Sequence, residues 1–287
     1  METVLQGRSK TVVIGPQQPF CIIGERINPT GRKTFAEELR GGDLSTVVVD
    51  TTAQIEAGAD VLDVNAGIPL VDEAELLAKM LKLVQEHTDA PICIDSSVIE
   101  ALEAGLSAYE GKPLVNSVTG EDERLEEILP LVARHRAAVI GLANDETGIP
   151  ETAQQRLEIA TKIVKVAGDY GIPPEDVVID PLAMTVGADT EAVTTTLEAI
   201  RLIRDNLGVN MSLGASNVSF GLPDRHALNA AFLPMAMAAG LTSAIMSTAR
   251  VCVEEVRAAD LLLGHDPWGA RWIAAHRARK AEAVAAS

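Results

Sequence analysis

Aromatic residues are scarce in this chain of 287 residues, at 3% of the composition, and there are only three cysteines. A chain poor in aromatics but rich in alanine, valine, isoleucine and leucine favours aliphatic layers of parallel strands and helices over an all-β sandwich. Cys21, Cys93 and Cys252 stand far apart and form no CxxC pair. Neither a disulfide framework nor a zinc knuckle is therefore expected.

Positive charge is also in short supply, because 24 Lys and Arg face 41 Asp and Glu, a net charge of −17. Nucleic acids and anionic membrane surfaces need Lys and Arg to neutralise phosphates, so neither is expected as a partner. No run approaches the ~18 apolar residues of a membrane span, and the opening METVLQGRSK lacks the apolar core of a secretory signal. We expect a cytoplasmic protein.

Hydrophobic residues make up 47% of the chain and charged residues 23%, which is enough to build a substantial core. The length suits one large α/β domain, and no linker rich in proline, glycine or serine divides it. We expect a single domain over residues 1–287. Within it, residues 1–20 are expected to form a hairpin at the barrel floor, and residues 268–287 a helical tail on the surface or at a dimer interface.

Short β-branched runs alternate with longer amphipathic stretches, several of which end on glycine. The expected strands are residues 21–28, 61–65, 91–96, 113–119, 138–145, 176–182, 210–219 and 242–247. The expected helices are residues 44–58, 72–87, 98–106, 121–136, 151–170, 190–206, 224–239 and 252–263. Eight of each predict an α/β protein with a (β/α)₈ TIM barrel. An open doubly wound sheet is the alternative, but no GxGxxG follows the first strand.

Polar residues gather at the carboxyl ends of these strands, where TIM barrels carry their chemistry. Asp and Asn are depleted in strands, and capping of the next helix explains only single cases. Several polar residues lie inside the apolar run or at its last position, so we expect their side chains to point into the barrel mouth. They are Asp63, Asp95, Asn116, Asp180 and Asn217.

A ring of carboxylates and amides with little lysine suits a heterocycle that displays N–H and NH₂ donors, such as the 2-amino-4-oxopyrimidine edge of a pterin. A sugar would also suit the ring, although sugars usually bring stacking aromatics. A Mg²⁺ site is a further alternative if Asp63, Asp95 and Asp180 converge on one point. We expect no bound metal.

Seven short motifs occur in register with the expected strands. They are IGERIN at 23–28, DVN at 63–65, IDS at 94–96, VNS at 115–117, GIP at 148–150, IDP at 179–181 and GASNVS at 214–219. Over about residues 20–265 the chain resembles the pterin-binding methyltransferases related to dihydropteroate synthase. The nearest branch is methyltetrahydrofolate:corrinoid-protein methyltransferase, which is related to the folate-binding domain of cobalamin-dependent methionine synthase.

This resemblance implies a dihydropteroate synthase-like barrel, acting as a homodimer, with methyltetrahydrofolate in its mouth. The methyl group would move between N5 of the folate and the cobalt of a corrinoid (cobalamin) carried on a separate protein. By the same resemblance, Asp95, Asn116 and Asp180 hold the pterin edge, and the amide of Asn217 reaches N5 and stabilises the transition state. Further expected members of the site are Asp63, Asn65, Glu25, Ser219 and Arg225, the last meeting the glutamate tail or the partner.

Three alternatives stay open: a dihydropteroate synthase-like enzyme, a pterin-binding protein without catalysis, and a metal-dependent barrel lyase. The synthase itself would show a DxxxxSTR loop and a KxxG motif, but this chain has NAGIP at 65–69 and SNVS at 216–219. The stretch DRHALN at 224–229 differs from the corrinoid-binding DxHxxG in its last residue, and no room remains for a corrinoid domain. The corrinoid is therefore expected to arrive on a partner.

Overall fold

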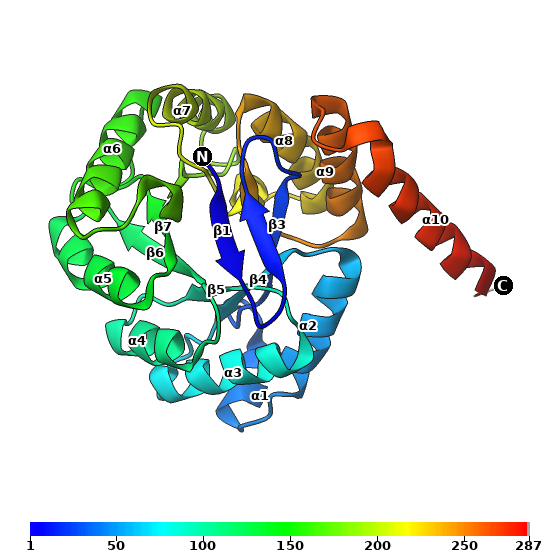
Figure 1. The fold of residues 1–287 in the computed structure, drawn as a ribbon, viewed down its shortest axis with the longest axis horizontal. Coiled ribbons are helices and arrows are strands. Elements are labelled where there is room, and N and C mark those ends of the chain that lie inside the picture. Colours follow the sequence, from blue (N-terminus) through cyan, green and yellow to red (C-terminus); the bar gives the residue numbers. More distant parts are fainter. Residues whose placement is uncertain (286–287) are drawn as a thin grey trace.

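The computed structural model describes residues 1–285, so residues 286 and 287 of the predicted tail lie outside the described part. Seven parallel strands form one curled sheet (Figure 1). They are β3 (Cys21–Ile27), β4 (Val61–Asn65), β5 (Ile92–Asp95), β6 (Leu114–Thr119), β7 (Ala138–Leu142), β8 (Val177–Asp180) and β9 (Ser243–Met246). The order across the sheet is β8-β7-β6-β5-β4-β3-β9, so neighbours in sequence are neighbours in space.

The eighth position of the barrel lies between β8 and β9, and there the predicted strand 210–219 is wrong in its extent. Met211 bridges to Ile179 of β8 and Gly214 bridges to Ile245 of β9, after which the chain turns into the 3-10 helix η2 (Ala215–Ser219). Gly, Ala, Ser and Asn at 214–217 are poor strand formers, which explains why the extended segment stops at Gly214. Residues 210–214 nevertheless close the ring.

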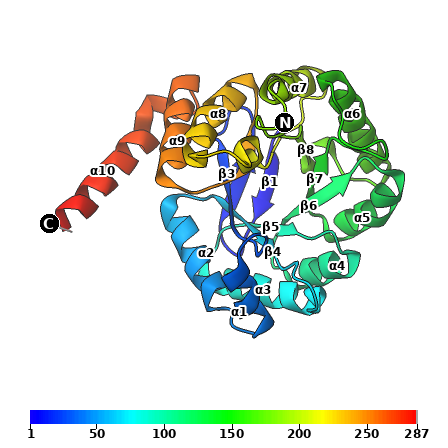
Figure 2. The ribbon, with the colours of Figure 1, turned by 180° about the vertical axis from the view of Figure 1, so that it is seen from behind.

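Helices cover the outside of the sheet, and the arrangement matches the expected (β/α)₈ architecture (Figures 1 and 2). The eight expected helices are α2 (Ser45–Ala57), α3 (Glu73–His87), α4 (Ile99–Ala108), α5 (Asp122–His135), α6 (Ala153–Asp169), α7 (Ala192–Asn206), α8 (Arg225–Ala239) and α9 (Arg250–Leu263). The sequence did not predict α1 (Lys33–Arg40). The tail forms α10 (Ala270–Ala285), and two further 3-10 helices are η1 (Pro174–Asp176) and η3 (Pro267–Gly269).

Alternation along the strands separates two cores. One lies between the sheet and the helices, and the other fills the inside of the barrel. The strands β1 (Thr3–Gln6) and β2 (Thr11–Ile14) pair as an antiparallel hairpin across one end of the barrel (Figure 1). Their buried side chains Leu5, Val12 and Ile14 belong to the inner core, so the amino ends of the barrel strands are plugged. Within residues 1–285, no helix is long and apolar enough to span a membrane.

Candidate active site

The inner face of the barrel carries the polar residues of the strand ends. Val61, Cys93 and Val178 belong to the inner core, and side chains two residues apart on a strand share a face. The side chains of Asp63 and Asp180 therefore point into the barrel, like those of the core residues.

Asn65, Asp95 and Asn116 lie side by side at the carboxyl ends of β4, β5 and β6. The strand register pairs Asn65 with Asp95, and Asp95 with Asn116. Asp63 lies one layer deeper on β4 and is 2% exposed. The structure therefore brings together four of the predicted site residues on one arc of the mouth.

Hydrogen bonds orient the polar groups of this arc. The Asn65 amide Nδ2 donates to Asp95 Oδ2 at 2.9 Å, and Asn116 Nδ2 donates to Asp63 Oδ1 at 3.0 Å. Within the described chain, the Oδ1 atoms of Asp95 and Asn116 have no hydrogen-bond partner. Two acceptors are thus left side by side at the barrel mouth, as a ligand with adjacent N–H donors requires.

Asp180 ends β8 and is held by backbone donors on two sides. Its Oδ1 accepts from Leu182 N at 2.7 Å, and the backbone N–H of Gly214 also donates to the carboxylate. The buried Arg156 of α6 donates Nη1 to Pro181 O at 2.9 Å and to Leu182 O at 2.8 Å, which fixes the loop after Asp180. The sequence analysis did not assign a role to Arg156. An arginine on the apolar face of an amphipathic helix nevertheless indicates a buried side chain with a specific partner.

The buried carboxyl groups of the mouth resist ionisation. Burial raises the pKa of Asp180 to about 7 and that of Asp95 to about 6. Burial, and then the neighbouring Asp95 carboxylate, raise the pKa of Asp63 well above its ordinary value. Burial and the proximity of the two carboxyl groups therefore disfavour a state in which both are ionised.

A second network attaches η2 to β3 and α8. Ser216 Oγ donates to Glu25 Oε1 at 2.9 Å, and Asn229 Nδ2 donates to Ser216 Oγ at 3.2 Å. Ser219 Oγ donates to Asn229 Oδ1 at 2.7 Å and accepts from Arg225 Nε at 3.2 Å. Glu25, Ser219 and Arg225 were predicted site residues. Ser216 and Asn229 were not, although both lie inside motifs that the sequence displays.

The guanidinium group of Arg225 is held by contacts within the η2 segment. Its Nη2 donates to Ser216 O at 2.7 Å, and its guanidinium carbon lies 5.9 Å from the centre of the Phe220 ring. Burial raises the pKa of Glu25, and the hydrogen bond from Ser216 opposes that rise. The network is therefore acidic at one end and basic at the other, with the amide and hydroxyl groups between them.

Asn217 lies in η2 with its side chain exposed, and within the described chain its amide makes no hydrogen bond. A Cβ added to Gly214 would lie 2.9 Å from Asn217 Nδ2, so the absence of a side chain at Gly214 makes room for the amide. Because the Gly214 N–H donates to Asp180, the Asn217 amide and the Asp180 carboxylate lie on two sides of the same residue.

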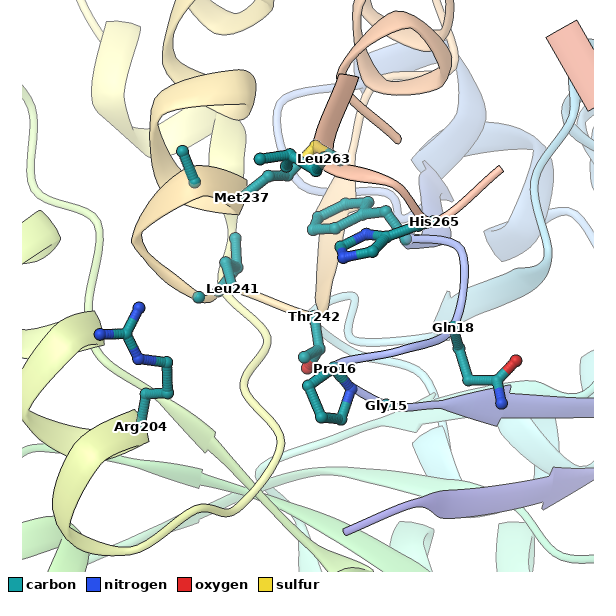
Figure 3. A pocket seen from close by; sticks show the side chains of 12 residues that line it. Gly15, Pro16, Gln18, Arg204, Met237, Leu241, Thr242, Leu263 and His265 are labelled. Atoms are coloured by element: carbon teal, nitrogen blue, oxygen red, sulfur yellow. The ribbon is translucent and has the colours of Figure 1, made fainter. Parts of the chain in front are cut away.

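The positions of the acidic side chains bear on the metal-dependent lyase alternative. Of the side chains that the structure describes, those of residues 1–280, no three from His, Cys, Asp or Glu are placed to hold a metal ion, so Asp63, Asp95 and Asp180 do not form the convergent site that the lyase alternative needs. A separate cavity of about 210 Å³, shown in Figure 3, lies at the amino ends of the barrel strands and not at the mouth. There, Pro16 before β3 and Thr242 before β9 line it together with Arg204 and His265.

Comparison with known proteins gives consistent results. Residues 24–247 match the family model described as pterin binding enzyme. The chain is 34% identical over 254 residues to the methylcorrinoid:tetrahydrofolate methyltransferase of Eubacterium limosum, covering 86% of this chain and 92% of that protein. It is 33% identical over 243 residues to the methionine synthase of Mycobacterium tuberculosis, covering 80% of this chain but only 20% of that longer protein.

Among solved structures, a Xanthomonas albilineans dihydropteroate synthase superposes with a TM-score of 0.70 at 18% identity, over 91% of this chain and 98% of that chain. A Yersinia pestis dihydropteroate synthase gives a TM-score of 0.67 at 14% identity, over the same shares of the two chains. At such low identity these two structures show the fold alone.

Proposed function

Because this chain belongs to the pterin-binding enzyme family, we propose that it transfers a methyl group between N5 of tetrahydrofolate and the cobalt of a corrinoid. It is a methyltransferase: its relative from Eubacterium limosum carries that name, and its relative from Mycobacterium tuberculosis is named methionine synthase. The observation that carries the proposal is the free amide of Asn217, which lies across Gly214 from the buried carboxylate of Asp180.

Hydrogen-bond acceptors at the barrel mouth bind the pterin edge. The open oxygens of Asp95 and Asn116 accept adjacent N–H groups, and the Asn65 amide holds the Asp95 carboxylate in place. Asp63 acts through Asn116, because it takes the NH₂ group and so turns the Asn116 oxygen toward the ligand. Asp180 supplies a third acceptor that backbone donors hold rigid.

The transfer step needs help at N5, which is a poor leaving group while its negative charge grows. An amide N–H directed at N5 stabilises that charge in the transition state, and Asn217 has such a donor free. The network from Glu25 through Ser216, Asn229 and Ser219 holds η2, and with it Asn217, in position. The corrinoid supplies the cobalt that exchanges the methyl group.

In this proposal the corrinoid is carried by a separate protein and reaches the barrel mouth from outside. We further propose a homodimer in the cytoplasm. Apolar side chains exposed on α8 and α9, among them Met235 at 49% and Leu262 at 86%, support a subunit interface. Light scattering of the purified chain tests the dimer, and a monomer at working concentration would contradict it.

The transfer is tested by anaerobic absorbance spectroscopy. Protein, methyltetrahydrofolate and cob(I)alamin are mixed, and loss of the cob(I)alamin band is followed against growth of methylcobalamin. Asn217→Ala should slow the transfer by about 10²- to 10³-fold while folate still binds, because one transition-state donor is lost. Asn206→Ala, at the end of α7, is the matched control and should keep the wild-type rate.

Two outcomes would contradict the proposal. A wild-type protein that fails to bind tetrahydrofolate in calorimetry would exclude the pterin site. A protein that binds folate but transfers no methyl group to free corrinoid or to any corrinoid protein of its own organism would be a binding protein.

A further inference from the structure

A groove of about 730 Å³ runs along the outside of the barrel between α2, α9 and α10. The last helix, α10, leaves the body of the molecule beside α9 and extends outward (Figures 1 and 2). Four arginines line the groove, with alanines of α10 and the end of α2 leaving space between them. The arginines are Arg250, Arg257, Arg271 and Arg279.

This concentration of positive charge contrasts with the net charge of −17 on the whole chain. The groove's own acids are Glu56 and Glu254, and Glu254 faces both Arg250, at 2.7 Å, and Arg279, at 3.5 Å. Among residues 1–280, whose side chains the structure describes, Arg257 and Arg271 form no ion pair.

Arg257 lies against the wall of the groove that the end of α2 forms. It is half-buried, and its Nη2 would lie 2.2 Å from a Cβ added at Gly58, so the group rests directly on the backbone at the end of α2. Burial lowers the pKa of the Arg257 guanidinium, and the like charge of Arg271 lowers it further. An anionic ligand that reaches the Arg257 guanidinium stabilises its charged form.

The groove begins at the barrel mouth. Thr248 and Arg250 directly follow β9, and Arg257 lies seven residues further along α9, about 10 Å away at 1.5 Å per residue. The proposed pterin acceptors occupy the arc from β4 to β8, and Asn217 lies next to β9. If N5 faces Asn217, as in the proposed function, the rest of the folate is attached on the side of the mouth where the groove begins.

We propose that the groove binds the tail of the folate when that tail is a chain of γ-linked glutamates, an inference that rests on the proposed methyl transfer. Each added glutamate contributes one carboxylate, and the arginines along α9 and α10 present a series of planar guanidinium forks that match carboxylates. Arg225 was the sequence-based candidate for this role, but its guanidinium is occupied within the η2 loop.

The test compares tetrahydrofolate carrying one glutamate with the same folate carrying five, by anaerobic calorimetry at low and high salt. At low salt the pentaglutamate should bind the wild type about tenfold more tightly, since two or three exposed ion pairs each contribute a few-fold. Added salt should reduce this advantage. The double variant Arg257→Gln/Arg279→Gln should lose most of it and still bind the monoglutamate as the wild type does.

Controls separate this inference from the function on which it rests. Arg201→Gln, an exposed arginine of α7, should keep the full pentaglutamate advantage. Arg279→Gln alone, which removes the guanidinium that faces Glu254, should lose part of it, which covers the case in which the double variant fails to fold. Failure of the wild type to bind even the monoglutamate would refute the proposed function itself.

Two results would overturn the tail site while leaving the function intact. One is equal affinity of the wild type for the two folates. The other is a pentaglutamate advantage that persists in the double variant. Should that variant bind both folates normally but transfer methyl more slowly to a corrinoid protein, the groove would instead be a docking site for an acidic partner surface.

Discussion

Replacing Asp180 by asparagine tests the electrostatics of the mouth directly. The amide keeps the size of the side chain and an oxygen for the Leu182 N–H, but it removes the carboxyl group whose pKa burial raises from 3.8 to about 7. Between these two pH values the folded protein keeps a proton that the unfolded chain has released. Wild-type stability therefore falls as pH rises through this window, and the variant lacks that fall.

The size of the effect follows from the pKa difference. A shift of about three units corresponds to about 4 kcal/mol over the whole window, as an upper limit, at 1.36 kcal/mol per unit. The chain has a pI near 4.7, so measurements should begin above it to avoid precipitation. Between about pH 5.5 and 8.5 the wild type should lose about 2 kcal/mol relative to Asp180→Asn.

Urea unfolding followed by circular dichroism at several pH values measures this difference. Because Asp63, Asp95 and Glu25 titrate in both proteins, the gap between the two stability curves isolates Asp180. If the amide packs less well than the carboxyl group, the variant's free energy of unfolding is lower by the same amount at every pH, and its pH dependence does not change. Asp169→Asn, an exposed carboxylate at the end of α6, is the matched control, and its gap to the wild type should stay constant.

A gap for Asp180→Asn that stays constant within about 0.5 kcal/mol over this range would refute the argument, since extrapolation errors are of that order. The carboxylate would then ionise as freely in the folded protein as in the unfolded chain. If the gap appears, the wild type retains a destabilising buried carboxyl group. That cost is understandable if the group is needed to accept hydrogen bonds from a ligand.

Further predictions concern residues around the same site. Gly214→Ala should push the Asn217 amide aside, since the new Cβ would lie 2.9 Å from its Nδ2. We expect methyl transfer to slow by about 10- to 100-fold with folate affinity retained, and an unchanged rate would contradict the placement of that amide. Arg156→Leu should lower the free energy of unfolding by about 2–4 kcal/mol, because the buried carbonyl of Pro181 loses its donor and the carbonyl of Leu182 keeps only the Thr196 hydroxyl. Urea unfolding measures this, and a loss under about 1 kcal/mol would count against it.

Much of the barrel could be predicted because its signals are local. The short β-branched runs, the amphipathic stretches between them and the glycine ends of several helices are visible in the sequence, and they located all eight covering helices. The positions of Asp63, Asp95 and Asn116 within their apolar runs likewise predict that they gather at the strand ends, where the register of β4, β5 and β6 brings them together. The predicted seventh strand was too long at its carboxyl end, because it included the poor strand formers at 214–217, which form the turn into η2.

Side-chain partnerships depend on packing between distant segments, and no local pattern encodes them. Asn229 lies 13 residues beyond Ser216 on another element, and Glu25 is separated from Ser216 by 191 positions. Their hydrogen bonds exist only because β3, η2 and α8 meet at one edge of the closed barrel. The arginine groove likewise requires α10 to begin beside α9 and the end of α2, so local residue patterns located the ring of polar groups while the folded arrangement set their partners and charges.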